Sequence, residues 1–121
     1  MRNIKITLLN NKRFTLENKD ELVIPEYETD ETLIEVEYPS EYKGFLKRVE
    51  FLNIRKERYT LELSQQDDNP ITFTIPKEMA LRGELKMQFV AYLLDDVNTL
   101  VPFHIVVVTI KRPTENNNEQ S

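Results

Sequence analysis

The sequence predicts an all-β protein, an antiparallel β-sandwich with one short helical turn. In nearly every segment apolar and polar residues alternate with a period of two, as they do when a strand has one buried and one wet face. About eight such segments follow one another at spacings near ten residues, and none shows the 3.6-residue period of a long amphipathic helix. Successive short strands without intervening helices are typical of a sandwich.

The chain length, 121 residues, fits one domain. We expect this domain to span residues 1–111, followed by a polar flexible tail or arm at residues 112–121, which contain no core-forming side chain. A domain of this size buries enough apolar surface to fold without disulfide bonds, and the chain has no cysteine.

The period-two segments and the turn residues between them set the expected strands. Asn10 and Asn11 mark a first hairpin because Asn tolerates the positive φ of tight turns, and Pro39 ends a later strand. Residues 95–99 read as a second hairpin loop. The expected strands are residues 4–9, 13–17, 32–38, 47–54, 58–64, 71–75, 84–94 and 100–111.

Residues 76–82 interrupt the alternation between two of these strands. Pro76 suits a first helical position, good helix formers follow, and Gly83 can adopt the left-handed conformation that closes a helix. We therefore expect one helical turn as a crossover, with the residues around it packing the core. The predicted core residues are Phe73, Leu81, Leu85, Met87 and Phe89.

Few residues suggest catalysis or metal binding. His104 is the one histidine, and it lies in the most apolar strand, where a structural role is favoured. The pairs Asp67-Asp68 and Asp95-Asp96 lack the spacing of a calcium loop and suit turns. We expect no catalytic, cofactor or metal site. An enzyme remains an alternative that needs a pocket joining His104 to an acid.

The charge distribution argues against nucleic acid as a partner, and the lengths of the apolar stretches argue against membrane insertion. The net charge is −5, and the basic residues are spread out apart from a cluster at residues 47–58, which suits a solvated strand edge. Acids concentrate between residues 26 and 37, where a wet sheet face is the simplest reading. No apolar stretch approaches the ~20 residues that span a bilayer, so we expect no membrane insertion.

The last strand is the most unusual segment. In residues 103–110, FHIVVVTI, both phases of the alternation are apolar, so one phase faces the core and the other meets a partner or a covering element. We predict a protein interface at Val106, Val108 and Ile110, with His104 beside them.

The order of motifs resembles the amino-terminal domain of bacteriophage baseplate upper proteins. The matching residues are Tyr42, Gly44 and Phe45 before a strand, then Phe73 to Pro76, then a short turn and the strand that begins Gly83, Leu85, Met87, Gln88 and Phe89. The resemblance covers roughly residues 30–110. The segment TLVPFHIVV departs from it, because the family has a serine-bearing entry to the last strand.

The resemblance implies an immunoglobulin-like antiparallel β-sandwich that serves as a non-enzymatic virion part. The expected role is an adaptor or anchoring module of a phage tail, baseplate, neck or fibre, assembled in the host cytoplasm. Its partners would be other virion proteins and copies of itself, as in a trimer. The alternative is a module that binds carbohydrate or the host-cell surface, for which exposed tyrosines or a calcium loop would be needed.

Overall fold

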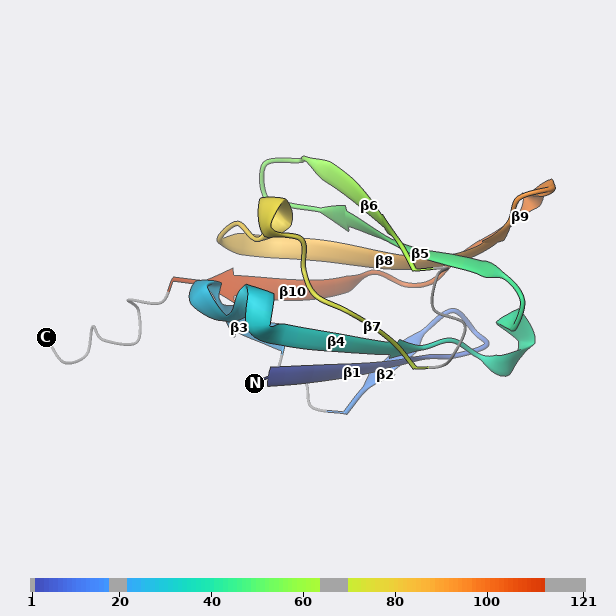
Figure 1. The fold of residues 1–121 in the computed structure, drawn as a ribbon, viewed down its shortest axis with the longest axis horizontal. Helices are drawn as coiled ribbons and strands as arrows, with labels where there is room; N and C mark the ends of the chain where they lie inside the picture. Colours follow the sequence, from blue (N-terminus) through green and yellow to red (C-terminus); the bar gives the residue numbers. More distant parts are fainter. Residues whose placement is uncertain (1, 18–21, 64–69, 113–121) are drawn as a thin grey trace, which may run out of the picture.

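The computed structural model describes residues 2–17, 22–63 and 70–112, which form two β-sheets packed face to face (Figure 1). The small sheet has the strand order β2-β1-β4-β7, and the large sheet has the order β3-β10-β8-β5-β6 with β9 also paired to β8. The strands are β1 (Arg2–Leu8), β2 (Phe14–Leu16), β3 (Val23–Pro25), β4 (Thr32–Glu37), β5 (Leu46–Leu52), β6 (Arg58–Glu62), β7 (Ile71–Phe73), β8 (Gly83–Leu93), β9 (Asp96–Pro102) and β10 (Val106–Lys111). The predicted all-β sandwich is confirmed.

The order of several strands agrees with that of an immunoglobulin-like sandwich. In the large sheet β10, β8 and β5 are neighbours, as the G, F and C strands are in that fold, and β4 lies beside β7 in the small sheet, as B lies beside E. Two pairs depart from the predicted antiparallel arrangement, because β1 runs parallel to β4 and β3 runs parallel to β10. The amino-terminal hairpin β1–β2 thus extends the small sheet as an addition to the common core.

The core is the space between the sheets, where the inward phase of each strand meets its counterpart. Edge-to-face aromatic contacts run through it from end to end, with centroid distances between 5.6 and 6.4 Å. In order along this chain of rings the residues are Tyr42, Phe103, Tyr38, Phe89, Phe73 and Phe51. Because the rings come from both sheets, they tie the two layers together.

Four of the five predicted core residues are buried. Phe73, Leu85, Met87 and Phe89 are in the core cluster, but Leu81 is only half-buried. The predicted helical turn over residues 76–82 is shorter than expected, a 3-10 helix η4 (Lys77–Met79) with Pro76 as its N-cap. In so tight a turn Met79 points inward instead of Leu81.

Gly83 follows this turn and opens β8. Its φ of 120° is accessible mainly to glycine, and an added Cβ would lie 3.2 Å from the Ile54 side chain. The positive φ expected there is confirmed, although Gly83 begins a strand and does not cap a helix. In the first hairpin the positive φ falls on Lys12, not on the predicted asparagines, and Asn11 Oδ1 accepts a hydrogen bond from the Arg13 amide.

The long last strand predicted at residues 100–111 is divided in two. β9 begins at Asp96, so most of the predicted loop 95–99 is strand, and β9 ends at Pro102, which has no N–H for a ladder. Phe103 then turns into the core, and its amide bonds to the Phe89 carbonyl at 2.9 Å. The His104 amide bonds to the Lys12 carbonyl, so the break is anchored on both sides.

Further 3-10 segments, which the sequence reading did not predict, lie at η2 (Glu26–Glu31) and η3 (Ser40–Tyr42). Part of the acidic run therefore forms η2, where Glu28 pairs with Arg2 and Glu26 with Arg82. Among the described residues, no helical segment is long and apolar enough to cross a membrane. The predicted tail lies almost entirely outside the described residues.

Candidate interaction surface

The predicted interface residues on the last strand lie in the core. Val106, Val108 and Ile110 are at most 2% exposed, because they face inward from β10 beside Met87 and Leu85 of β8. The prediction for these three residues was wrong, because it took the buried phase of the alternation for the exposed one. Which phase faces the core depends on how the sheets pack, and the strand's own sequence is apolar on both.

Four other apolar residues of β9, the break and β10 are exposed on the outer face of the large sheet. Leu100 is 46% exposed, Ile105 47% and Val107 38%, and Pro102 is exposed between them. We call these four residues the apolar ridge. Leu100 and Pro102 lie opposite Tyr92 and Val90 of β8. Tyr92 is partly exposed, whereas Val90 is buried.

His104, predicted beside the interface, is exposed at the break between β9 and β10. It lies next to Ile105 of the ridge in sequence. This part of the prediction agrees with a surface position, and nothing in the structure tests a binding role for the imidazole.

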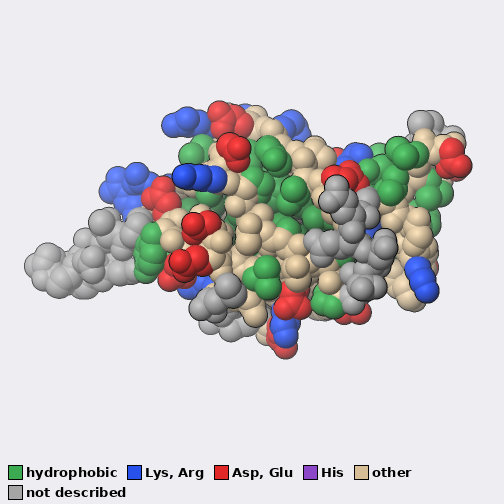
Figure 2. Space-filling model, viewed as in Figure 1, with side chains coloured by type: hydrophobic (Ala, Val, Ile, Leu, Met, Phe, Trp, Pro, Cys, Tyr) green, Lys and Arg blue, Asp and Glu red, His purple; other side chains and the backbone are tan. Residues whose placement is uncertain are grey.

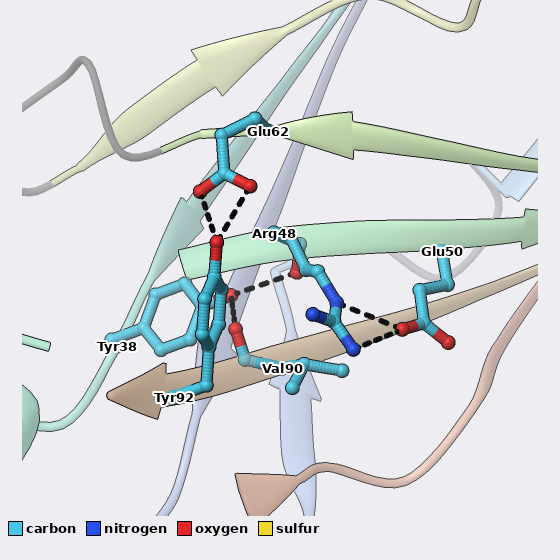
Figure 3. Close-up of polar contacts among 6 residues, drawn as sticks. All are labelled: Tyr38, Arg48, Glu50, Glu62, Val90 and Tyr92. Carbon is cyan, nitrogen blue, oxygen red and sulfur yellow. Dashed lines mark hydrogen bonds and ion pairs between the residues drawn. The ribbon is translucent and has the colours of Figure 1, made fainter. Parts of the chain in front are cut away.

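The polar network beside the ridge fixes several side chains on the outer face (Figure 3). The Arg48 guanidinium donates to Glu50 Oε2 at 2.8 Å and lies 4.8 Å from the centre of the Tyr92 ring. The Tyr92 hydroxyl donates to the Glu62 carboxylate at 2.7 Å. These four hydrogen-bonded or stacked side chains of β5, β6 and β8 lie next to the ridge. We call Arg48, Glu50, Glu62 and Tyr92 the outer-face network.

A buried hydroxyl supports this network from the opposite side of the sheet. Tyr38, at the end of β4, donates to the Val90 carbonyl at 3.2 Å and lies 3.4 Å from the Arg48 carbonyl (Figure 3). Burial raises the pKa of this hydroxyl well above its ordinary value. The small sheet thereby holds in place the backbone that carries the network.

A shallow pocket of about 70 Å³ lies between the ridge and the neighbouring strands. Its lining includes Glu50, Leu52, Arg58, Lys86, Gln88 and Ile105. Pockets for small molecules are commonly 300 to 1,000 Å³, roughly, so this one suits the tip of a single side chain.

The projecting end of the large sheet is also partly apolar. The β8–β9 hairpin extends beyond the other strands, and hydrophobic side chains gather on it (Figures 1 and 2). Leu94 in its two-residue turn is 78% exposed. The Thr99 hydroxyl donates to Asp96 Oδ2 at 2.6 Å, which holds the base of the turn.

The other residues considered for chemistry do not converge. Within the described ranges, no three His, Cys, Asp or Glu side chains lie close enough to hold a metal ion. Asp95 and Asp96 are exposed at the hairpin tip, far along the sheet from the acids of η2 (Figure 1). The other pair, Asp67-Asp68, lies outside the described residues.

The tyrosines that a sugar-binding surface would need are separated. Tyr27 is 59% exposed, whereas Tyr38 and Tyr42 are buried in the core and Tyr92 is held by the outer-face network. The basic residues 47–58 are distributed over both faces of β5, a turn and β6 and form no continuous basic patch.

Comparison with protein-family models and with curated proteins finds no match for this chain. The inference about function therefore depends on the surface just described and on the residue pattern. Sequence reasoning missed the outer-face network, although β5 and β8 each carry polar side chains on the phase opposite their core residues. Only the strand order places Arg48, Glu62 and Tyr92 together.

Proposed function

We propose that this protein is a non-enzymatic structural module that works by protein–protein contact through the outer face of its large sheet. Its partner would cover the apolar ridge and the adjoining outer-face network. The resemblance to baseplate upper proteins supports placing it in a bacteriophage particle, as an adaptor or anchoring part of the tail, baseplate, neck or fibre.

The observation that carries this proposal is the difference between the two outer faces of the sandwich. On the small sheet the outward side chains include Lys5, Thr7, Thr15, Glu35 and Glu37, as expected of a wet face. On the large sheet the apolar ridge runs from β9 through the break to the first outward side chain of β10, Val107, and Thr109 and Lys111 beyond it are polar. Exposed apolar side chains that follow one another along residues 100–107 favour a contact surface, whereas isolated ones would need no explanation.

The composition of the adjoining network also favours a protein partner. Tyrosine and arginine are over-represented among the residues that contribute most to binding at interfaces. Tyr92 and Arg48 are already held in one conformation by Glu62 and Glu50, so less side-chain entropy is lost when a partner binds. The ridge would supply the apolar centre and the network the polar rim.

The test is site-specific photo-cross-linking in the cells where the particle is assembled. A benzophenone amino acid replaces Ile105 in one variant and Thr7, on the outer face of the small sheet, in a matched control. We expect a discrete cross-linked virion protein from position 105 and none from position 7. Absence of a cross-link from 105, or equal products from both, would contradict the proposal.

Carbohydrate binding is the second candidate, and one hollow of the surface favours it. A hollow of about 440 Å³ lies at the end of the first hairpin, lined by Leu8, Leu9, Asn10, Asn11, Pro39 and Ser40. Amide and hydroxyl groups beside apolar side chains suit a sugar, and the volume is in the range of small-molecule sites. A glycan that raises the Tm of the wild type but not of Asn10→Ala would support this candidate, because binding stabilises the folded state.

A further inference from the structure

The edge strand β6 differs from the other free edges of the two sheets. The edge strands β2, β3 and β7 are three residues long and β3 includes Pro25, while β9 ends in Pro102. Short strands and prolines are devices that prevent an edge from pairing with another chain. β6 has five residues and no proline, and it lies at the upper rim of the molecule in Figure 1.

The backbone of β6 presents hydrogen-bonding groups away from its neighbour. The Leu63 amide donates to Lys47 of β5, and the Glu57 carbonyl accepts from the amide of Asn53. Because successive residues of an antiparallel strand alternate between the two sides, the backbone groups of Arg58 and Thr60 point outward. Among the described residues no strand pairs with this side.

The side chains of β6 are complementary to those of the same strand running in the opposite direction. The strand reads Arg-Tyr-Thr-Leu-Glu. When a second copy is placed antiparallel with Thr60 opposite Thr60, Arg58 faces Glu62 and Tyr59 faces Leu61. Opposite charges, an aromatic beside an aliphatic side chain and a threonine pair are each favourable cross-strand pairs.

This register also agrees with the direction of the backbone groups and with the two faces of the sheet. Arg58 and Thr60 would meet their partners as hydrogen-bonded pairs. Tyr59, 38% exposed and in edge-to-face contact with Phe51, would gain cover from Leu61 of the second copy. Figure 2 shows acidic and basic side chains along the upper rim of the molecule, with hydrophobic side chains beneath them.

We propose that two copies of this chain associate through β6 as a two-fold symmetric dimer, which joins their large sheets into one continuous sheet. The charges at the ends of the strand select the antiparallel arrangement, because parallel in-register pairing would place Arg58 against Arg58. The contact is confined to one strand edge, so the dimer is of the small, concentration-dependent class, with Kd on the order of micromolar to millimolar. The β6 edge does not include the apolar ridge, although Glu62 also belongs to the outer-face network and Arg58 lines the pocket beside Ile105. The dimer is argued from the edge and its cross-strand pairs alone, so its test does not depend on the proposed function.

The test is sedimentation equilibrium from about 10 μM to 1 mM protein, a range set by the affinity expected of small interfaces. We expect the wild type to approach twice the chain mass. Arg58→Glu and Glu62→Arg, each alone, face like charges in the dimer and raise its Kd at least about tenfold. An equimolar mixture of the two single variants pairs opposite charges again and recovers a dimer, although Glu62→Arg has also lost its bond to Tyr92.

A cross-link provides a second measurement in a chain without native cysteine. Opposed Cα atoms of a hydrogen-bonded pair lie about 5.5 Å apart, within the range that a disulfide spans. Thr60→Cys should therefore form a disulfide dimer under mild oxidation, and Thr7→Cys, on the other sheet, should not. A wild type that stays monomeric at 1 mM, or single variants that associate as the wild type does, would overturn the proposal. The Val107→Glu control should leave the dimer mass unchanged.

Discussion

Neighbouring valines of β10 lie in opposite environments. Val106 and Val108 face the small sheet and are fully buried, whereas Val107 between them is 38% exposed on the outer face of the large sheet. The same residue type therefore has two different effects within three positions. Inward valines stabilise the fold through burial and close packing, whereas the outward valine contributes little to the isolated domain and is available to a partner.

The largest difference should follow from placing a charge on each face in turn. Val108→Glu buries a carboxylate without a partner, and we expect a loss of at least about 4 kcal/mol, enough to unfold a domain of ordinary stability. Val107→Glu changes a partly exposed side chain and should cost less than about 1 kcal/mol. Urea unfolding followed by circular dichroism measures both. Similar losses for the two variants would contradict the assignment of the faces.

A substitution that forms a cavity should have a smaller effect, and it tests whether the core includes residues of the segment between β7 and β8. Leu85 is fully buried opposite Val108, and Leu85→Ala should reduce the free energy of unfolding by about 2 to 5 kcal/mol. Leu81 is only half-buried, and the same substitution there should cost about 1 kcal/mol or less. The pair is compared by denaturant midpoint at constant m. A larger loss of unfolding free energy for Leu81→Ala than for Leu85→Ala would show that Leu81 packs in the core.

The Tyr38 hydroxyl links the two faces, so its removal should have an intermediate effect. Tyr38→Phe leaves buried carbonyls of Val90 and Arg48 without this donor, at a cost of about 1 to 2 kcal/mol. Thermal or urea unfolding at neutral pH measures this loss, with Tyr27→Phe, at an exposed position, as the control. A loss no greater than that of the control would show that the bond contributes nothing.

The same hydroxyl gives stability a pH dependence of defined sign. Burial raises the pKa of Tyr38 in the folded state, so the full stability is present below the unfolded pKa of about 10. Above that pH the unfolded chain loses the proton and the folded chain keeps it, and stability falls by up to about 1.4 kcal/mol per pH unit. Unfolding between pH 8 and 11 should therefore show a shallower decline in Tyr38→Phe. Burial also raises the pKa of Tyr42, so some decline should remain.

The smallest effect is expected on the outer face. Tyr92→Phe removes a hydrogen bond to Glu62 at an exposed site and should cost less than about 1 kcal/mol. A double-mutant cycle with Glu62→Gln measures the coupling between the two side chains. Coupling well above that value would mean that the network stabilises the fold itself, not only the conformation of a contact surface.

Much of the architecture could be predicted from local pattern. The alternation of apolar and polar residues identified the strands that have one buried and one exposed face, as at Ile34 and Val36 in β4. Pro39, Pro76 and Gly83 marked the ends of strands close to where the structure has them. Predictions were wrong where a tertiary contact overrode the pattern. Phe103 interrupts the last strand because its ring is buried between Tyr38 and Tyr42, which lie more than sixty residues earlier in the chain. The local sign of this break was Pro102.

The candidate surface was predictable only as far as the strand that carries it. The composition of residues 103–110 indicated that one phase of this segment would not face the core, because a two-layer sandwich covers only one face of each sheet. By itself the sequence determined which side chains alternate, and hence that residues 105–108 are apolar on both phases. The tertiary structure decided which face is sealed and which strands become neighbours. It brought Tyr92, Arg48 and Glu62 together and left β6 at an edge, because sheet order and packing depend on contacts between residues far apart in the chain.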